Sequence, residues 1–122
     1  MTLQELAESS YANARAKGFY EQIDELMAHP HLTGEQKMFI RALWMGNRLM
    51  LIVSELAEAL EAVRHHNWSA EPGSGGFAEE MADAAIRIGD MDKAETLHLE
   101  EAISAKAKYN ANRPHRHGGK VT

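Results

Sequence analysis

The chain contains no cysteine among its 122 residues, which excludes disulfides, thiol chemistry and thiolate metal sites. Long apolar runs are also missing: the longest, residues 49–53, is far shorter than the roughly 18 residues that a membrane-spanning helix needs. The first residues carry neither a basic segment nor an apolar one, so no signal peptide is expected. These absences fit a protein of the reducing cytoplasm that does not enter a membrane.

Basic charge is in short supply as well. Lysine and arginine number 13 against 18 aspartates and glutamates, and the formal net charge of −5 argues against a general nucleic-acid binder. The distribution is uneven, because residues 113–120 are basic while the middle of the chain is acidic. No strand-like alternation, internal repeat or low-complexity tract is present. The length predicts a single domain over residues 1–122, with a flexible basic tail from about residue 113, and the absence of strand-like alternation favours an all-α fold.

Helix signals divide the chain clearly. Capping boxes begin helices at Thr2 with Glu5 and at Thr33 with Gln36. The expected elements are a helix that stops near Gly18, a short helix ended by Pro30, a long helix over 34–65, a glycine-rich loop over 67–76, a helix over 77–94, a break at 97–99 and a last helix over 99–111.

The long helix carries an apolar stripe broad enough to be buried on more than one side. A helix of this length in so short a chain is expected to pack against a second copy of itself. We therefore predict a bundle of about four to five helices, in which a four-helix core is completed by oligomerisation.

Two pairs of carboxylates stand out in this helical pattern: Glu55 with Glu58, and Glu80 with Asp83. Residues three apart lie on one face of a helix, so each pair projects together. If the pairs face each other, their repulsion requires a cation between them. Four oxygen donors suit a hard ion such as Mg²⁺, with Mn²⁺ as a substitute. The alternative is that all four are solvent-facing charges of ordinary helices.

The spacing Glu55-x-x-Glu58, then 21 residues, then Glu80-x-x-Asp83 resembles the ExxE…ExxD signature of the MazG-like all-α nucleoside triphosphate pyrophosphohydrolases. That family includes dCTP pyrophosphatases, dimeric dUTPases and phosphoribosyl-ATP pyrophosphatases. The last helix adds a match to the family's K-x-x-x-N…R element, and the resemblance covers residues 39–120. The matching residues of that element are Lys106, Asn110 and Arg113.

The resemblance implies an enzyme that hydrolyses (d)NTPs between the α and β phosphates to (d)NMP and pyrophosphate, cleansing the nucleotide pool. It implies that the two carboxylate pairs bind Mg²⁺, that Glu55 or Glu58 orients or deprotonates water, and that Glu61 helps hold a second ion or water. It also implies that the Lys106, Asn110 and Arg113 set contacts the triphosphate, and that the chain forms a homodimer or homotetramer.

Two further residues are candidates for contact with a base or for a lid. Trp68 lies in the glycine-rich loop, where it either stacks on a base or packs back on a helix. Asp90 follows Asp83 by seven residues, two turns along the same helix face, and reaches the same ion, contacts a ligand or remains a solvated charge.

Three other functions compete with this interpretation. Within the family, a phosphoribosyl-ATP pyrophosphatase is the nearest alternative. A non-enzymatic helical oligomerisation or regulatory module would leave the cationic set of the last helix unexplained. A ferritin-like di-iron protein needs Glu-x-x-His pairs on two helices, and the sequence has a single one, Glu95 with His98, at an expected helix break.

Overall fold

The computed structural model describes residues 1–122, and every regular element in it is a helix. The predicted all-α class is therefore confirmed. None of the helices is both long enough and apolar enough to cross a membrane. The elements are α1 (Leu3–Ala16), α2 (Glu21–Met27), α3 (Gly34–Arg64), α4 (Phe77–Glu95), α5 (Leu99–Ala111) and the short turn α6 (Arg116–Gly119).

Both predicted capping boxes are present. The Thr2 hydroxyl accepts a hydrogen bond from the Glu5 backbone N–H at 3.0 Å, and the Glu5 carboxylate accepts one from the Thr2 N–H at 3.3 Å. Thr33 and Gln36 form the same reciprocal pair, at 3.1 and 2.9 Å. Each box satisfies backbone donors that would otherwise lack a partner at the start of a helix. The long helix predicted over 34–65 is thus confirmed as α3.

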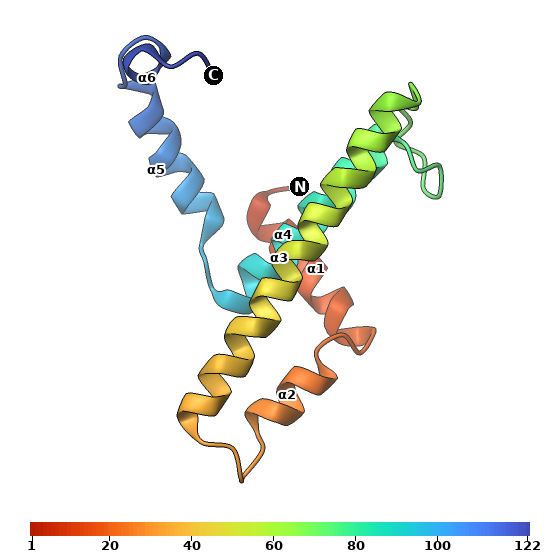
Figure 1. Cartoon of the computed structure of the whole chain (residues 1–122), viewed down its shortest axis with the longest axis vertical. Helices are drawn as coiled ribbons and strands as arrows, with labels where there is room; N and C mark the ends of the chain where they lie inside the picture. Colours follow the sequence, from red (N-terminus) through yellow and green to blue (C-terminus); the bar gives the residue numbers. More distant parts are fainter.

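Left-handed backbone marks the places where the chain changes direction. Gly18 has φ +84° at the end of α1, as its position in the sequence predicted. Thr96 and His98, with φ 53° and 54°, separate α4 from α5 and confirm the predicted break. Beyond this break α5 extends away from the other helices (Figure 1).

The packed core is made by α1, α3 and α4. In Figure 1, α3 and α4 run side by side through the centre of the molecule, and α1 packs against α4. The contacts are close because buried residues there are small. A Cβ on Gly89, for example, would lie 3.0 Å from Leu6 Cγ and 3.3 Å from Ser10 Oγ. The buried alanines of this core are Ala7, Ala59, Ala62 and Ala84.

Within one chain the packed core therefore has three helices, and the predicted completion of a four-helix core by oligomerisation stays a prediction. The last helix, α5, has no buried residue within one chain. The reason lies in the backbone at Thr96 and His98, whose left-handed conformation directs α5 away from α3.

Candidate metal centre

Three of the four predicted ligands converge between α3 and α4. One carboxylate oxygen from each of Glu55, Glu80 and Asp83 lies within 4.8 Å of the other two. Glu55 and Glu80 are buried, at 8% and 7% exposure, and Asp83 is half-buried. Three carboxylates so close together in a partly dry site repel one another strongly unless a proton or a cation intervenes.

The loop over residues 67–76 brings the two helices together. The Phe77 N–H donates to the Asn67 carbonyl at 2.8 Å, and the Asn67 side chain donates to the Ser74 carbonyl at 3.0 Å. A Cβ at Gly76 would lie only 2.2 Å from the Ser69 carbonyl oxygen, so the loop closes tightly only with glycine there. These contacts fix the start of α4, and with it the positions of its carboxylates relative to α3.

Glu79 belongs to this loop rather than to the cluster. Its carboxylate accepts hydrogen bonds from the Ser74 N–H and hydroxyl at 2.9 and 3.1 Å. Burial acts to raise the pKa of Glu79, but hydrogen bonds from residues 73–75 outweigh it and lower the pKa. Glu79 is thus a stable anion that anchors the loop.

Glu80 is the least satisfied of the three carboxylates. As an anion, its buried Oε2 has no hydrogen-bond partner. Burial, followed by hydrogen bonding and charge repulsion from the neighbouring carboxyl groups of Glu58 and Glu55, raises the pKa of Glu80 to about 7. Either a shared proton or a cation can therefore satisfy this oxygen.

Asp83 experiences the same environment. Burial raises its pKa, the negative charges of Glu55 and Glu79 add to the effect, and Arg87 opposes it. Arg87 also donates a hydrogen bond from Nε to Glu55 Oε1 at 2.8 Å. Sequence reasoning overlooked this arginine, although it follows Asp83 by four residues on the same helix face, a spacing that would have indicated it.

The residues present fit a hard divalent cation. All three converging groups offer carboxylate oxygens, the ligands that Mg²⁺ and Mn²⁺ prefer. The buried, unpartnered oxygen of Glu80 is an independent sign of a missing positive group.

Glu58 and Glu61 line an open pocket beside Glu80, of about 390 Å³, together with His65 and Asn67. Glu58 is exposed and stands outside the converging group of three. Glu61 Oε1 lies 2.8 Å from His65 Nε2, and Arg64 donates to Oε2 at 3.3 Å. The contact with His65, then that with Arg64, lowers the pKa of Glu61. Both predicted residues therefore lie at the rim, near the cluster but not in it.

A second pocket, of about 490 Å³, opens on the other side of the cluster between α1, α3 and α4. Glu55 and Asp83 line it, whereas Glu80 lines the first pocket. The second pocket combines charged and apolar side chains, and its two arginines are matched by three carboxylates, those of Glu55, Asp83 and Asp90. Its basic members are Arg48 and Arg87, and its large apolar members are Phe19, Leu51 and Ile86. The acidic cluster thus lies between two open spaces of different chemistry.

Asp90 lies on the wall of this second pocket, where internal contacts already engage it. The Tyr20 hydroxyl donates to Asp90 Oδ1 at 2.6 Å, and Arg48 forms an ion pair with Oδ2. The Arg48 guanidinium lies over the rings of Tyr20 and Trp44, 5.0 and 4.7 Å from their centroids. Burial raises the pKa of Tyr20, although the charge of Arg48 opposes it. Asp90 therefore positions Arg48 at the pocket.

Trp68 packs edge-to-face on Phe77, with the ring centroids 5.9 Å apart, and remains 57% exposed. Of the two interpretations of Trp68, packing back on a helix agrees with this contact, because Phe77 is the first residue of α4. Its position at the base of the loop adds to the closure of the turn between α3 and α4.

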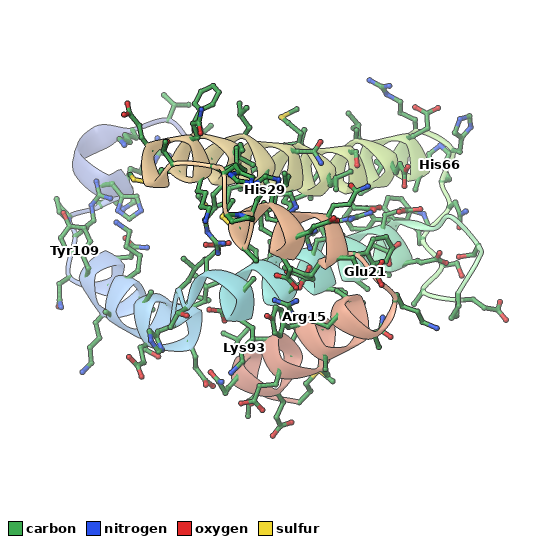
Figure 2. The ribbon with its side chains drawn as sticks, turned by 90° about the horizontal axis from the view of Figure 1, so that it is seen from below. Arg15, Glu21, His29, His66, Lys93 and Tyr109 are labelled. Carbon is green, nitrogen blue, oxygen red and sulfur yellow. The ribbon has the colours of Figure 1, made fainter.

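The set predicted to bind triphosphate lies apart from the cluster within one chain. Lys106 and Arg113 flank the ring of Tyr109, at 4.6 and 5.7 Å from its centroid, and Asn110 is exposed on the same helix. Figure 2 shows Tyr109 at the opposite end of the molecule from His66, which follows α3 directly. The predicted set is separated from the acidic cluster because α5 extends away from α3 and α4.

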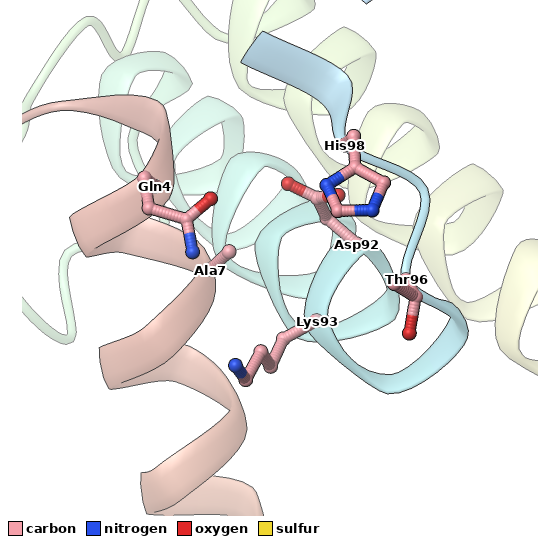
Figure 3. A pocket seen from close by; sticks show the side chains of 6 residues that line it. All are labelled: Gln4, Ala7, Asp92, Lys93, Thr96 and His98. Carbon is pink, nitrogen blue, oxygen red and sulfur yellow. The ribbon is translucent and has the colours of Figure 1, made fainter. Parts of the chain in front are cut away.

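A small cavity of about 150 Å³ lies at the junction of α1 with the end of α4 (Figure 3). It is lined by Gln4, Ala7, Asp92, Lys93, Thr96 and His98. Asp92 is buried there and accepts a hydrogen bond from the Leu99 N–H at 3.1 Å, which stabilises the first turn of α5. This cavity shares no residue with the acidic cluster, and Asp92 is explained by its helix contact.

Comparisons of the chain with protein-family models, with curated proteins and with solved structures find no match. The similarity to MazG-like enzymes accordingly rests on the residues of the sequence, and membership of that family stays a prediction.

Proposed function

We propose that the protein is a Mg²⁺-dependent hydrolase that splits (d)NTPs into (d)NMP and pyrophosphate, with Mn²⁺ able to replace Mg²⁺. Two observations at Glu80 carry the proposal: its buried Oε2 has no hydrogen-bond partner, and one of its carboxylate oxygens lies within 4.8 Å of oxygens of Glu55 and Asp83. A role in cleansing the nucleotide pool follows from the sequence resemblance.

In this proposal Glu55, Glu80 and Asp83 hold the cation. A bound Mg²⁺ lowers the pKa of its water and polarises phosphoryl oxygens. Glu58 is the better candidate to orient water and accept its proton, because it faces the open pocket, whereas Glu55 already accepts a hydrogen bond from Arg87. Water supplies the oxygen that joins one phosphorus, the α–β anhydride bond breaks, and the leaving oxygen takes up the proton.

Of the two pockets beside the cluster, the second supports an anionic substrate, whereas the first is lined by Glu58, Glu61 and Glu80 and suits a cation or water. The second pocket has the size of a small-molecule site and carries both arginine and apolar side chains. Arg48 and Arg87 line this pocket with two of the carboxylates and are the contacts to phosphate proposed within one chain. The set predicted from the resemblance, Lys106, Asn110 and Arg113, remains a second proposal for that role. Glu61 at the rim of the first pocket remains a candidate for an accessory ion or water.

The experiment is a panel of NTPs, dNTPs and phosphoribosyl-ATP, incubated with folded protein and Mg²⁺ and assayed for pyrophosphate. Release from at least one nucleoside triphosphate, abolished by EDTA, is the expected result. Release from phosphoribosyl-ATP alone would favour the phosphoribosyl-ATP pyrophosphatase alternative. If folded protein yields no pyrophosphate from any member of the panel, the proposed activity is wrong.

A further inference from the structure

Positive charge is divided unevenly between two parts of the chain. Residues 1–101 contain all 18 acidic residues and eight of the 13 lysines and arginines, whereas residues 102–122 contain five basic residues and no acidic one. The formal net charge of −5 thus combines −10 in the first part with +5 in the second, and it argues against nucleic-acid binding only for the chain as a whole. We call residues 102–122 the basic arm; its cations are Lys106, Lys108, Arg113, Arg116 and Lys120.

The two parts also differ in how their cations are satisfied. All five arginines of residues 1–101 form ion pairs with carboxylates. No lysine or arginine of the basic arm has a carboxylate partner. Lys106 and Arg113 instead lie over the ring of Tyr109, and Lys108 is exposed. The arm therefore keeps its charge available for an anion from outside the chain.

The fold holds this charge away from the acidic cluster. α5 has no buried residue, and beyond the left-handed backbone at Thr96 and His98 it extends away from the other helices (Figure 1). Asp83 already lies about 18 Å along α4 from the last residue of that helix. Exposed charges further apart than the Debye length, about 8 Å at physiological salt, are largely screened from one another. A polyanion on the arm is therefore little repelled by the cluster.

One face of α5 combines the cations with an aromatic ring. Lys106, Tyr109 and Arg113 follow one another at intervals of three and four residues, so their side chains lie on the same side of the helix. Lys106 Nζ and Arg113 Cζ lie 4.6 and 5.7 Å from the centroid of the Tyr109 ring, which is 60% exposed. This face is about 10 Å long, and Arg116 and Lys120 continue the positive charge beyond it.

We propose that the basic arm binds single-stranded nucleic acid, with phosphates on its lysines and arginines and a base stacked at Tyr109. Surfaces that bind single strands combine positive charge along the backbone with aromatic rings that stack on bases. The bases of a duplex are already stacked on one another, so a duplex would leave the Tyr109 ring unused. A membrane surface requires a broad apolar helix face, but α5 exposes only two large apolar side chains, Ile103 and Tyr109.

The test is the fluorescence anisotropy of labelled single strands of about 20 nucleotides, one of DNA and one of RNA, titrated with the full chain in EDTA. EDTA removes divalent cations, so neither hydrolysis nor a metal-bridged nucleotide contributes to the signal. At least one strand should bind at about 50 mM salt, and log K should fall against log salt with a slope between about −2 and −3.5, as three to five phosphate contacts require. The strand that binds more tightly shows whether RNA or DNA is the preferred partner.

Variants on α5 test the residues without disturbing the core, because this helix has no buried residue. Lys106→Gln and Arg113→Gln should each weaken binding and make the salt slope shallower by about 0.7. Tyr109→Ala should weaken binding by about fivefold to a hundredfold, whereas Tyr109→Phe keeps the ring and should bind like wild type. Lys17→Gln removes an exposed lysine at the end of α1 and should leave binding unchanged.

Competition identifies the class of ligand. Unlabelled single strand should displace the probe, whereas duplex DNA, phosphatidylserine vesicles and free dNTP at equal phosphate concentration should each compete at least about fivefold less well. Equal competition by dNTP would assign the arm to mononucleotides, by vesicles to a lipid surface and by duplex to phosphate alone, and each of these results would overturn the inference. So would the absence of binding by folded wild type, or an equal loss in Lys17→Gln and the α5 variants. The inference uses no residue of the metal centre and does not depend on the proposed hydrolysis.

Discussion

Arg87 Nε donates a 2.8 Å hydrogen bond to Glu55 Oε1, so a positive side chain already touches one of the three converging carboxylates. Such a contact acts in two directions. It holds Glu55 in place and offers charge to an anionic substrate, but it also repels an incoming cation. In the proposed hydrolysis, both cation affinity and substrate affinity depend on this balance.

Replacement of Arg87 by glutamine should therefore separate the two effects. We expect Mn²⁺ to bind several-fold to about tenfold more tightly, because a repelling charge is gone, and KM for the nucleotide to rise by a similar factor. Calorimetric titration and steady-state kinetics measure the two quantities. A fall in Mn²⁺ affinity would instead mean that Arg87 acts mainly by holding Glu55 in position.

The raised pKa of Glu80 predicts how the metal-free protein responds to pH. Its pKa is about 7 in the folded state, against 4.5 for an ordinary glutamate, so its contribution to stability is complete below 4.5 and is lost as the pH rises through 7. Urea unfolding in EDTA should show the free energy of unfolding falling across this range.

Two comparisons check the origin of that pH dependence. Glu80→Gln cannot ionise, so its unfolding free energy should fall less between pH 4.5 and 7. Added Mg²⁺ should restore stability to the wild type near pH 8 but not to Glu80→Gln. Equal pH dependence in the two proteins would assign the effect to another group.

Substitutions at Asp83 and Glu58 should distinguish a ligand from a group that acts on water. Asp83→Asn should lower both Mn²⁺ affinity and turnover, the latter by a hundredfold or more. Glu58→Gln should lower turnover by about 10²–10⁴-fold while Mn²⁺ still binds, since Glu58 stands outside the converging group. Circular dichroism checks that both stay helical, and full turnover in Glu58→Gln would remove it from the mechanism.

Tyr20 provides a test of the contacts that hold Asp90 and Arg48 at the second pocket. Tyr20→Phe removes the 2.6 Å hydrogen bond to Asp90, and the loss of one buried hydrogen bond should cost about 1–2 kcal/mol in unfolding free energy. Because burial raises the pKa of Tyr20 above 10, its contribution persists below pH 10 and is lost at higher pH. Absorbance titration should show a late-ionising tyrosine that is missing from Tyr20→Phe.

Local signals in the sequence were sufficient for most helix boundaries. The capping boxes at Thr2 and Thr33 and the turn at Gly18 are determined by residues three or four apart. They could therefore be predicted from the local sequence. The direction of α5 was not predictable. It depends on left-handed backbone at Thr96 and His98. Neither residue type adopts this conformation often, so the sequence does not predict it there.

The site shows the same division. The resemblance implied that the two carboxylate pairs share one cation, and the structure brings Glu55, Glu80 and Asp83 together. Residues three apart on a helix still differ in direction by about 60°, which is why Glu58 reaches the rim of the pocket rather than the cluster. The position of Arg48 at the pocket depends on its contacts with Asp90 and Tyr20, which belong to other parts of the chain. Residue spacing along one helix cannot predict contacts of this kind.

The most direct measurement of the cation site is Mn²⁺ binding followed by electron paramagnetic resonance, with Glu101→Gln on exposed α5 as a control of equal charge. Wild type and Glu101→Gln should bind Mn²⁺ equally, and Glu80→Gln and Asp83→Asn should each bind it at least tenfold more weakly. No binding by folded wild type, or an equal loss in Glu101→Gln and the two cluster variants, would contradict a metal centre at Glu55, Glu80 and Asp83.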